Sequence, residues 1–252
     1  MSIVQLYKTQ ADDFQANLSL FIFLSITMSN IIGMKTKKLI KQVSVLFMFT
    51  LFTGLTALTI AIKTNQATIQ TLIGISLAIK IMIYYCIAKE DIQSNIKTHQ
   101  KREKKLDWHV LTVRVMIGCV FIPHFCEKLF TGETFRQVDV LAFTELGVPM
   151  PYLVVIIAGL CEFFGSIAIT CGFLTRLSAL CTALYLIIAT YLGGHFSAGY
   201  IWVSEGGGWE YPVLWFALIL CFAVFGPGYF SIDQHINKTY KLPKFIKWLT
   251  NV

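Results

Sequence analysis

Seven blocks of apolar residues dominate this sequence and restrict what it can fold into. A helix of about 20 apolar residues crosses the hydrocarbon layer of a bilayer, and several such blocks are not typical of a water-soluble domain. Hydrophobic residues make up 56% of the chain and charged residues only 14%. The blocks predict an all-α integral membrane protein with seven transmembrane helices, at Phe14–Met34, Gln42–Ile62, Ala67–Ala88, Trp108–Cys126, Tyr152–Leu174, Leu177–Gly193 and Tyr211–Phe225.

Lysine and arginine are distributed unevenly between the connections that join these spans. Fifteen of them lie in the connections and tail that seven spans place on one side, and four lie on the other side. Because cytoplasmic connections carry the excess of Lys and Arg, we expect the N-terminus outside and the C-terminus in the cytoplasm of a bacterial-type inner membrane. Topology thus accounts for the net charge of +7, and nucleic-acid binding is not indicated.

The spacing of the blocks predicts four regions. We expect a three-span N-terminal region at 1–88, a cytoplasmic linker at 89–107, a four-helix bundle at 108–236 and a basic tail at 237–252. The tail mixes lysines with aromatic and aliphatic residues, which suits a segment lying on the anionic cytoplasmic leaflet. The first block follows Asp12 and Asp13 and not a basic segment, so we expect it to stay in the mature protein.

The seven cysteines do not indicate a disulfide framework or a zinc site. No two of them form a C-x-x-C pair, and all lie within or at the ends of apolar blocks. They are interpreted as small buried hydrophobic residues.

One carboxylate, Glu162, lies near the middle of the fifth predicted span. On a helical wheel it shares a face with Ala158, Gly165 and Ser166. Small residues allow close approach of another helix, so this face is expected to point into a bundle and not at lipid. A carboxylate at this depth is a candidate functional group; the alternative is a protonated Glu that holds two helices together by a hydrogen bond.

Basic residues occupy one stripe of the fourth predicted span. Arg114, Phe121 and Lys128 are seven residues apart, with Arg114 inside the cytoplasmic boundary and Lys128 at the external one. Arg114 has the alternative interpretation of reaching the cytoplasmic headgroups. Asp233 is expected on the same side, where a salt bridge to Arg114 would be structural.

Further polar residues gather at the predicted external end. His124, Glu127 and Lys128 end the fourth span, His195 follows the sixth, and Glu205 and Glu210 flank Gly206–Gly208. Together with Glu162 they would line a cavity that opens outward. His124, Glu127, His195 and Glu210 would also suit a metal, although the usual role of such residues is solvation, and no metal is assigned.

From about Trp108 onward the chain resembles the DoxX family of four-span membrane proteins. The resemblance rests on motifs in a common order: Arg114, Pro123-His124 with Lys128-Leu129-Phe130, Gly147-x-Pro149, Ala158-Gly159-x-x-Glu162-x-x-Gly165, Gly172-x-x-Thr175-Arg176, His195, Gly206-Gly207-Gly208-x-Glu210-Tyr211-Pro212 and Gly226-Pro227-Gly228-x-x-Ser231-x-Asp233. It covers about half the chain, and residues 1–105 resemble nothing identified.

Three residues depart from the family pattern. Phe125 stands where the family often has Gly, Glu127 where Gln is common, and Ser166 where a second Gly is frequent. The resemblance implies membrane redox work, because related DoxD-type subunits belong to a thiosulfate:quinone oxidoreductase and some DoxX proteins are tied to thiol and oxidative-stress defence.

Our leading hypothesis is a component of a quinone-linked oxidoreductase system with a partner redox subunit. Glu162 and His195 are the predicted catalytic residues, with Glu162 exchanging protons and His195 or His124 linking it to the external face. No Rossmann, haem-attachment or flavin motif is present, so electrons would have to pass through a bound quinone, the cofactor that the resemblance implies, or through a partner subunit. Two alternatives remain, a non-enzymatic scaffold for a redox enzyme and a small-molecule transporter. The predicted cofactor-binding residues are Arg114, His124, Glu127, Lys128 and Glu210.

Overall fold

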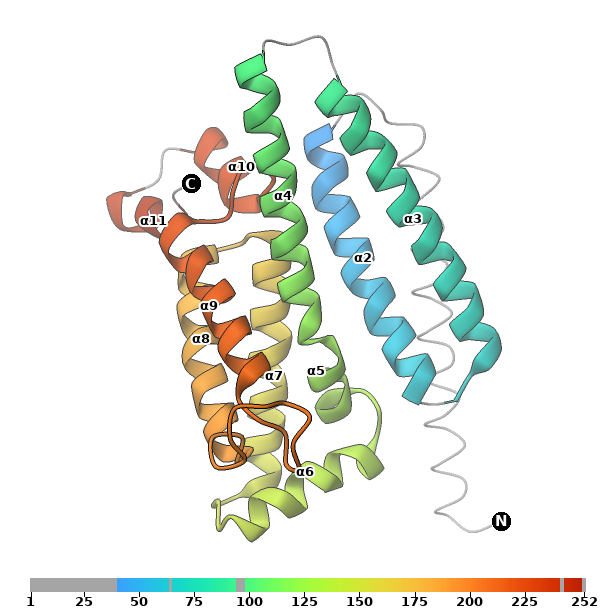
Figure 1. The fold of residues 1–252 in the computed structure, drawn as a ribbon, viewed down its shortest axis with the longest axis vertical. Helices are drawn as coiled ribbons and strands as arrows, with labels where there is room; N and C mark the ends of the chain where they lie inside the picture. Colours follow the sequence, from blue (N-terminus) through green and yellow to red (C-terminus); the bar gives the residue numbers. More distant parts are fainter. Residues whose placement is uncertain (1–39, 64, 94–97, 241–242, 251–252) are drawn as a thin grey trace. The chain divides into compact units, whose positions relative to one another are not determined.

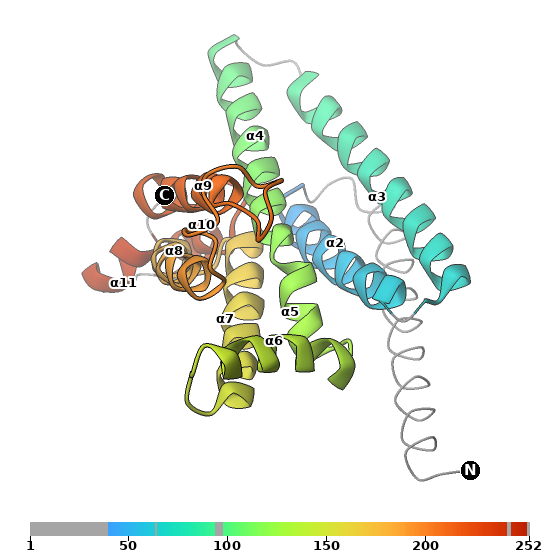
Figure 2. The same cartoon turned by 60° about the horizontal axis from the view of Figure 1, so that its bottom comes forward.

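The computed structural model describes residues 40–63, 65–93, 98–240 and 243–250, and every regular element in these ranges is an α-helix. Figures 1 and 2 show the helices in two views. They are α2 (Ile40–Lys63), α3 (Ala67–Gln93), α4 (Thr98–Val120), α5 (Ile122–Leu129), α6 (Glu133–Glu145), α7 (Pro151–Cys171), α8 (Thr175–Leu192), α9 (Glu210–Phe225), α10 (Ile232–Thr239) and α11 (Lys244–Leu249).

Six of the seven predicted spans fall on these helices, and the first lies outside the described residues. Four segments are long and apolar enough to cross a membrane: Ala67–Gln93, Lys101–Leu129, Pro151–Cys171 and Thr175–Leu192. The apolar helices Phe47–Lys63 and Glu210–Phe225 are shorter. The all-α membrane fold is therefore confirmed, while the total of seven spans and the orientation of the termini stay predictions.

Two helical segments were not expected from the sequence. The described part of the predicted linker 89–107 belongs to α3 and α4, because its Lys, Arg and Glu residues are good helix formers. Lys104 Nζ lies 2.6 Å from Asp91 Oδ1, which ties the start of α4 to the end of α3. Helix α6 lies between two spans, and its short mixed pattern gave no clear periodic signal.

The described residues divide into two compact units, and the boundary passes through α4 and α7. The first unit contains the described parts of 1–108 together with 121–160, and the second contains 109–120 together with the described parts of 161–252. The two units do not coincide with the predicted N-terminal region (1–88) and four-helix bundle (108–236). These predicted domain bounds stay predictions.

In the first unit, α2 packs beside α3 and also contacts α5. Ala57 and Ala61 of α2 are fully buried against Ile73 and Leu77 of α3. The rings of Phe52 and Phe125 stack with centroids 5.9 Å apart. Phe125, where the family often has Gly, therefore fills the contact between α2 and α5.

In the second unit, α8 and α9 lie side by side, as both views show. Small residues bring α4 and α7 together, because Ser166 Oγ donates a hydrogen bond of 2.5 Å to the Gly118 carbonyl oxygen. A Cβ atom at Gly118 would lie 2.0 Å from Thr170 Oγ1, so no larger residue fits there. Ser166, a departure from the family pattern, thus has a defined packing role.

Candidate functional site

Glu162 is buried inside the second unit, with only 5% of its surface exposed. Its Oε1 atom accepts a 2.6 Å hydrogen bond from the hydroxyl of Tyr185 on α8. The face it was predicted to share with Gly165 and Ser166 makes helix contacts, since a Cβ atom at Gly165 would lie 2.5 Å from Thr182 Oγ1. The carboxyl group therefore points into the bundle and has a phenol as a defined partner.

Tyr185 is the residue of this pair that sequence reasoning missed. Tyrosines of membrane proteins concentrate at the interfaces, whereas Tyr185 lies in the middle of α8, seven residues before its end. That position was an available signal, because a polar side chain at this depth requires a partner.

Arg114 is fully buried in the second unit and binds backbone carbonyl groups. Its Nε lies 3.4 Å from the carbonyl oxygen of Thr170, and its two terminal nitrogens donate to the carbonyl oxygens of Pro227 and Phe230. The guanidinium thus connects the end of α7 to the segment between α9 and α10. This geometry favours a structural role over the predicted binding of a cofactor.

Asp233 lies close to this arginine and caps α8. Its carboxylate accepts hydrogen bonds from the backbone N–H groups of Leu174 and Thr175, at 2.7 and 2.8 Å, and from Thr175 Oγ1 at 2.7 Å. A helix N-terminus has unsatisfied N–H groups and a positive dipole end, and a carboxylate satisfies both. The structural role predicted for Asp233 therefore takes the form of a cap supplied by α10.

His195 lies in the loop that follows α8 and does not contact Glu162. Its Nδ1 atom donates to the carbonyl oxygens of Gly206 and Gly207, at 3.2 and 2.8 Å, and must carry the hydrogen because carbonyl oxygens only accept. Its ring lies 5.5 Å from that of Trp202. The end of α8 at Leu192 is about 10 Å beyond Tyr185 along the helix axis. The two predicted catalytic residues are thus separated.

Glu210, the first residue of α9, joins the same loop and not the Glu162 pair. Its Oε2 atom accepts a 3.2 Å hydrogen bond from the backbone N–H of Trp202. The ring of Trp202 also packs edge-on against Tyr211, with centroids 5.3 Å apart. The side chains of His195 and Glu210 therefore make their hydrogen bonds to the backbone of the glycine-rich loop.

Glu127, His124 and Lys128 belong to α5 in the first unit. Glu127 accepts a 2.5 Å ion-paired hydrogen bond from Lys63 Nζ at the end of α2. Lys128 Nζ lies 3.3 Å from the carbonyl oxygen of His124 and 3.9 Å from Asp139 Oδ2 on α6. These three predicted residues are near one another, and Asp139 joins them without having been identified from the sequence.

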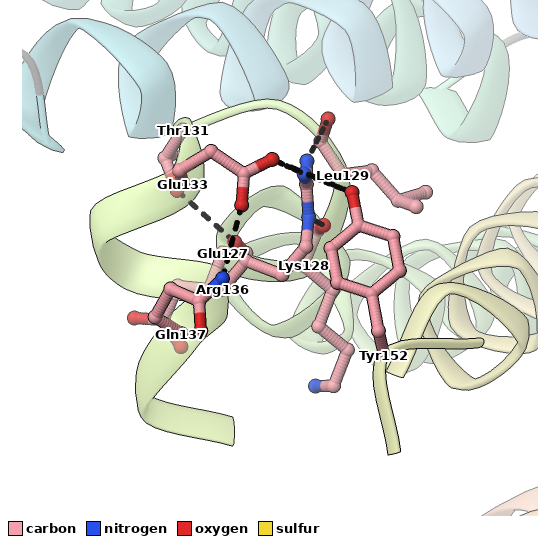
Figure 3. Close-up of polar contacts among 8 residues, drawn as sticks. All are labelled: Glu127, Lys128, Leu129, Thr131, Glu133, Arg136, Gln137 and Tyr152. Atoms are coloured by element: carbon pink, nitrogen blue, oxygen red, sulfur yellow. Dashed lines mark hydrogen bonds and ion pairs between the residues drawn. The ribbon is translucent and has the colours of Figure 1, made fainter. Parts of the chain in front are cut away.

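An arginine on α6 organises the end of α5, as Figure 3 shows. Arg136 Nε donates a 2.6 Å hydrogen bond to the carbonyl oxygen of Lys128, and Nη1 lies 2.6 Å from Glu133 Oε1 and 3.1 Å from the Tyr152 hydroxyl. Burial raises the pKa of the nearby Asp139, an effect that Lys128 opposes and Glu127 reinforces. The predicted cofactor-binding residues at this end are therefore part of a network of ion pairs.

Among the described residues, no group of three or more His, Cys, Asp or Glu side chains is arranged to hold a metal ion. The seven cysteines all carry free thiols. Cys126 and Cys171 are buried as predicted, Cys119 is half-buried, and the other four are exposed on apolar helices. The prediction of buried cysteines is therefore confirmed only in part.

The helices and the buried Glu162 with its partner Tyr185 define a class of protein: a multi-pass helical membrane protein with an ionisable group inside its bundle. The DoxX family model matches residues 109–195. Inner membrane protein YqjF of Escherichia coli (strain K12) is 33% identical over 147 residues, which cover 54% of this chain and 99% of YqjF. The chain therefore belongs to the DoxX family, and it is a multi-pass inner membrane protein. No solved structure matches it.

The matched region does not include the first two described helices. Helix α2 ends at Lys63 and α3 at Gln93, before the family model begins at residue 109. Glu162, Arg114, Tyr185 and His195 lie within the matched residues. The candidate site is therefore in the part of the chain that the family model matches, and α2 and α3 lie outside that part.

Proposed function

We propose that this protein is the membrane component of a quinone-linked oxidoreductase system, in which Glu162 and Tyr185 bind and protonate the quinone headgroup. The observation that carries the proposal is the 2.6 Å hydrogen bond between the two side chains inside an apolar bundle. A buried carboxyl group at this depth is costly to maintain, and such groups in membrane proteins commonly serve proton exchange.

The surroundings of the pair fit a lipid-tailed ligand. Tyr185 is partly exposed, and its neighbours Leu184 and Ile188 on α8 are 61% and 49% exposed. Phe164 on α7 is 61% exposed. These apolar side chains face outward from the second unit, where lipid tails would contact them. A quinone would approach Tyr185 along this surface from within the bilayer.

Quinone reduction consumes two electrons and two protons, and the residues of this chain would supply the protons. Tyr185 donates its hydroxyl hydrogen to Glu162 Oε1. The phenol would hydrogen-bond a quinone carbonyl oxygen and pass it a proton, and the carboxyl group of Glu162, in its protonated form, would return a proton to the phenolate. Reprotonation of Glu162 from water would supply the second proton by the same route. The electrons would come from a partner redox subunit.

Arg114 and His195 have smaller parts in this proposal than the sequence suggested. Arg114 binds three backbone carbonyl groups, and His195 is hydrogen-bonded within its own loop. Glu162 and Tyr185 are therefore the groups proposed to touch the ligand, and Arg114 is assigned to positioning of the bundle.

The test compares variants of the full chain in membranes that contain its native partners. We expect Glu162→Gln and Tyr185→Phe each to reduce the rate of quinone reduction by about 10²-fold or more, the usual contribution of a positioned acid or base. Glu145→Gln and Tyr191→Phe are matched controls, because both residues are exposed and the substitutions remove the same chemical groups as those at the site.

Unchanged quinone reduction in both site variants would disprove the proposal. In that case, loss of a co-purified redox enzyme on deletion of the basic tail would favour the scaffold alternative. Substrate flux into vesicles that depends on Glu162 would favour the transporter alternative.

A further inference from the structure

The C-terminal tail of the second unit presents lysines and aromatic side chains together. The sequence places Lys238, Lys241, Lys244 and Lys247 at intervals of three residues. Asp233 is the only acidic residue after Glu210, and it is fully buried with its carboxylate bound to Leu174 and Thr175. The positive charge of the tail is therefore not balanced by any acid of its own.

Large apolar side chains accompany these lysines. Phe245 and Trp248 lie at i and i+3 of α11, so they share a face of this helix. They are 71% and 52% exposed, and Tyr240 before α11 is 64% exposed. Aromatic side chains beside lysines are typical of segments that lie in the headgroup region of a membrane.

The tail is held against the bundle and does not extend away from it. Asn237 donates from Nδ2 to the Thr250 carbonyl oxygen, and Thr250 Oγ1 donates to Asn237 Oδ1 at 3.0 Å. Leu249 and Thr250 are buried, and α11 contacts α8. Figure 1 shows α10 and α11 at the end of the second unit where α8 begins. Because α8 is itself a candidate span, this position is where headgroups would surround the bundle.

Tyr229 fixes the first of these lysines in the same region. Lys238 Nζ lies over the Tyr229 ring, 4.4 Å from its centroid. This contact keeps a positive charge next to the segment that connects α9 to α10. The lysine is thereby positioned beside the end of an apolar helix, where a phosphate group of a lipid would lie.

We propose that α10 and α11, with their lysines Lys238, Lys244 and Lys247, form a docking surface for the headgroups of anionic phospholipids. The lysines would attract the phosphate groups, while Phe245 and Trp248 would insert between the upper parts of the lipid tails. The clamp between Asn237 and Thr250 would hold α11 parallel to this surface. This surface is a different part of the molecule from Glu162, and its role is independent of the quinone-linked function.

The test uses the full chain in nanodiscs of phosphatidylcholine alone or with phosphatidylglycerol added. Amide hydrogen exchange of residues 237–250 is followed by mass spectrometry. We expect exchange to slow on addition of phosphatidylglycerol, and high salt to reverse the effect. In the triple variant Lys238→Gln, Lys244→Gln, Lys247→Gln, this protection should be lost. Each lysine removed should weaken the binding of the tail to the anionic surface by about fivefold.

The matched control removes the same charge elsewhere. The triple variant Lys89→Gln, Lys101→Gln, Arg102→Gln should keep the protection of the tail. Equal protection in neutral and anionic nanodiscs, or equal loss in both triple variants, would overturn the proposal. Protection in native membranes that is absent from nanodiscs of pure anionic lipid would also overturn it and would indicate an acidic protein partner.

Discussion

Gly172 occupies a point in the second unit where both the backbone and the available space require glycine. Its φ angle is +68°, and a Cβ atom there would lie 2.5 Å from Ser231 Cβ and 2.9 Å from Arg114 Nη1. The close approach allows the turn between α7 and α8 to contact the residues that precede α10. The arginine and its carbonyl partners can therefore assemble only around a residue without a side chain.

We expect Gly172→Ala to lower the stability of the protein markedly. The left-handed backbone costs alanine about 1–2 kcal/mol, and overpacking adds about 1–3 kcal/mol. Gly147→Ala is a matched control, because Gly147 has a φ of +70° and a Cβ atom there would have no neighbour within 4 Å, so only the backbone cost applies. Thermal unfolding in detergent measures the loss of stability in each variant. An equal loss in the two variants would show that the neighbours of Gly172 move aside for the added Cβ atom without loss of stability.

Asp139 in the first unit gives stability a dependence on pH. Burial raises the pKa of this carboxyl group above its ordinary value of 3.8. The folded state then binds the proton more tightly than the unfolded state, so stability rises as pH falls through the folded pKa toward the ordinary value.

We expect this contribution to disappear in Asp139→Asn. The difference in unfolding free energy between the original protein and Asp139→Asn should shift in favour of the original protein as pH is lowered below neutral. Denaturant unfolding in detergent at several pH values measures this difference. A difference that does not change with pH, or that changes in the opposite direction, would contradict the assignment.

At the scale of helices, polar contacts at helix ends add to the packing within each of the two units. Asp233 of α10 caps the N-terminus of α8, Arg114 of α4 binds the carbonyl groups that follow α9, and Lys63 of α2 pairs with Glu127 of α5. In lipid there is no hydrophobic driving force between apolar helices, because lipid is as apolar as their side chains, so packing and hydrogen bonds must hold them together. Directional polar contacts at the ends therefore contribute to the register of the helices.

Asp233→Asn should weaken the cap of α8. Asparagine keeps one acceptor oxygen, but its NH₂ group would face N–H and O–H donors that now bind the second carboxylate oxygen. The substitution also removes the negative charge that interacts favourably with the positive end of the helix dipole. We expect a loss of about 1–3 kcal/mol in unfolding free energy. Glu205→Gln is the control, since this exposed loop residue loses the same charge. Equal stability of the two variants would show that the cap contributes nothing.

At the scale of the whole chain, topology follows from the number of spans and the distribution of charge. An odd number of spans places the termini on opposite sides of the membrane, and the excess of Lys and Arg in one set of connections orients the chain. The described helices account for six predicted spans, and the first predicted span lies outside them.

Reporter fusions test this topology. A fluorescent protein that folds only in the cytoplasm should be bright when attached to the C-terminus and dark at the N-terminus. Alkaline phosphatase, which is active only outside, should give the reverse. Activity of one reporter at both ends would mean an even number of spans.

The apolar blocks predicted most of the helices because membrane insertion depends on local composition. A block of about 20 apolar residues forms a helix in lipid whatever its neighbours are, since its backbone groups must be satisfied within the segment. The prediction failed where structure does not depend on apolar length. Helix α6 is short and mixed, and the start of α4 is charged, so hydropathy marked neither of them as helical.

For this protein the sequence alone determined the membrane class, the family and the burial of Glu162, because each depends on residue type at a given spacing. Only the tertiary structure decided which residues meet. Tyr185 was shown to be the partner of Glu162, three backbone carbonyl groups were shown to bind Arg114, and His195 was placed away from both. The reason is physical: which side chains meet is set by the packing and register of helices, and these depend on contacts between residues that are distant in the chain.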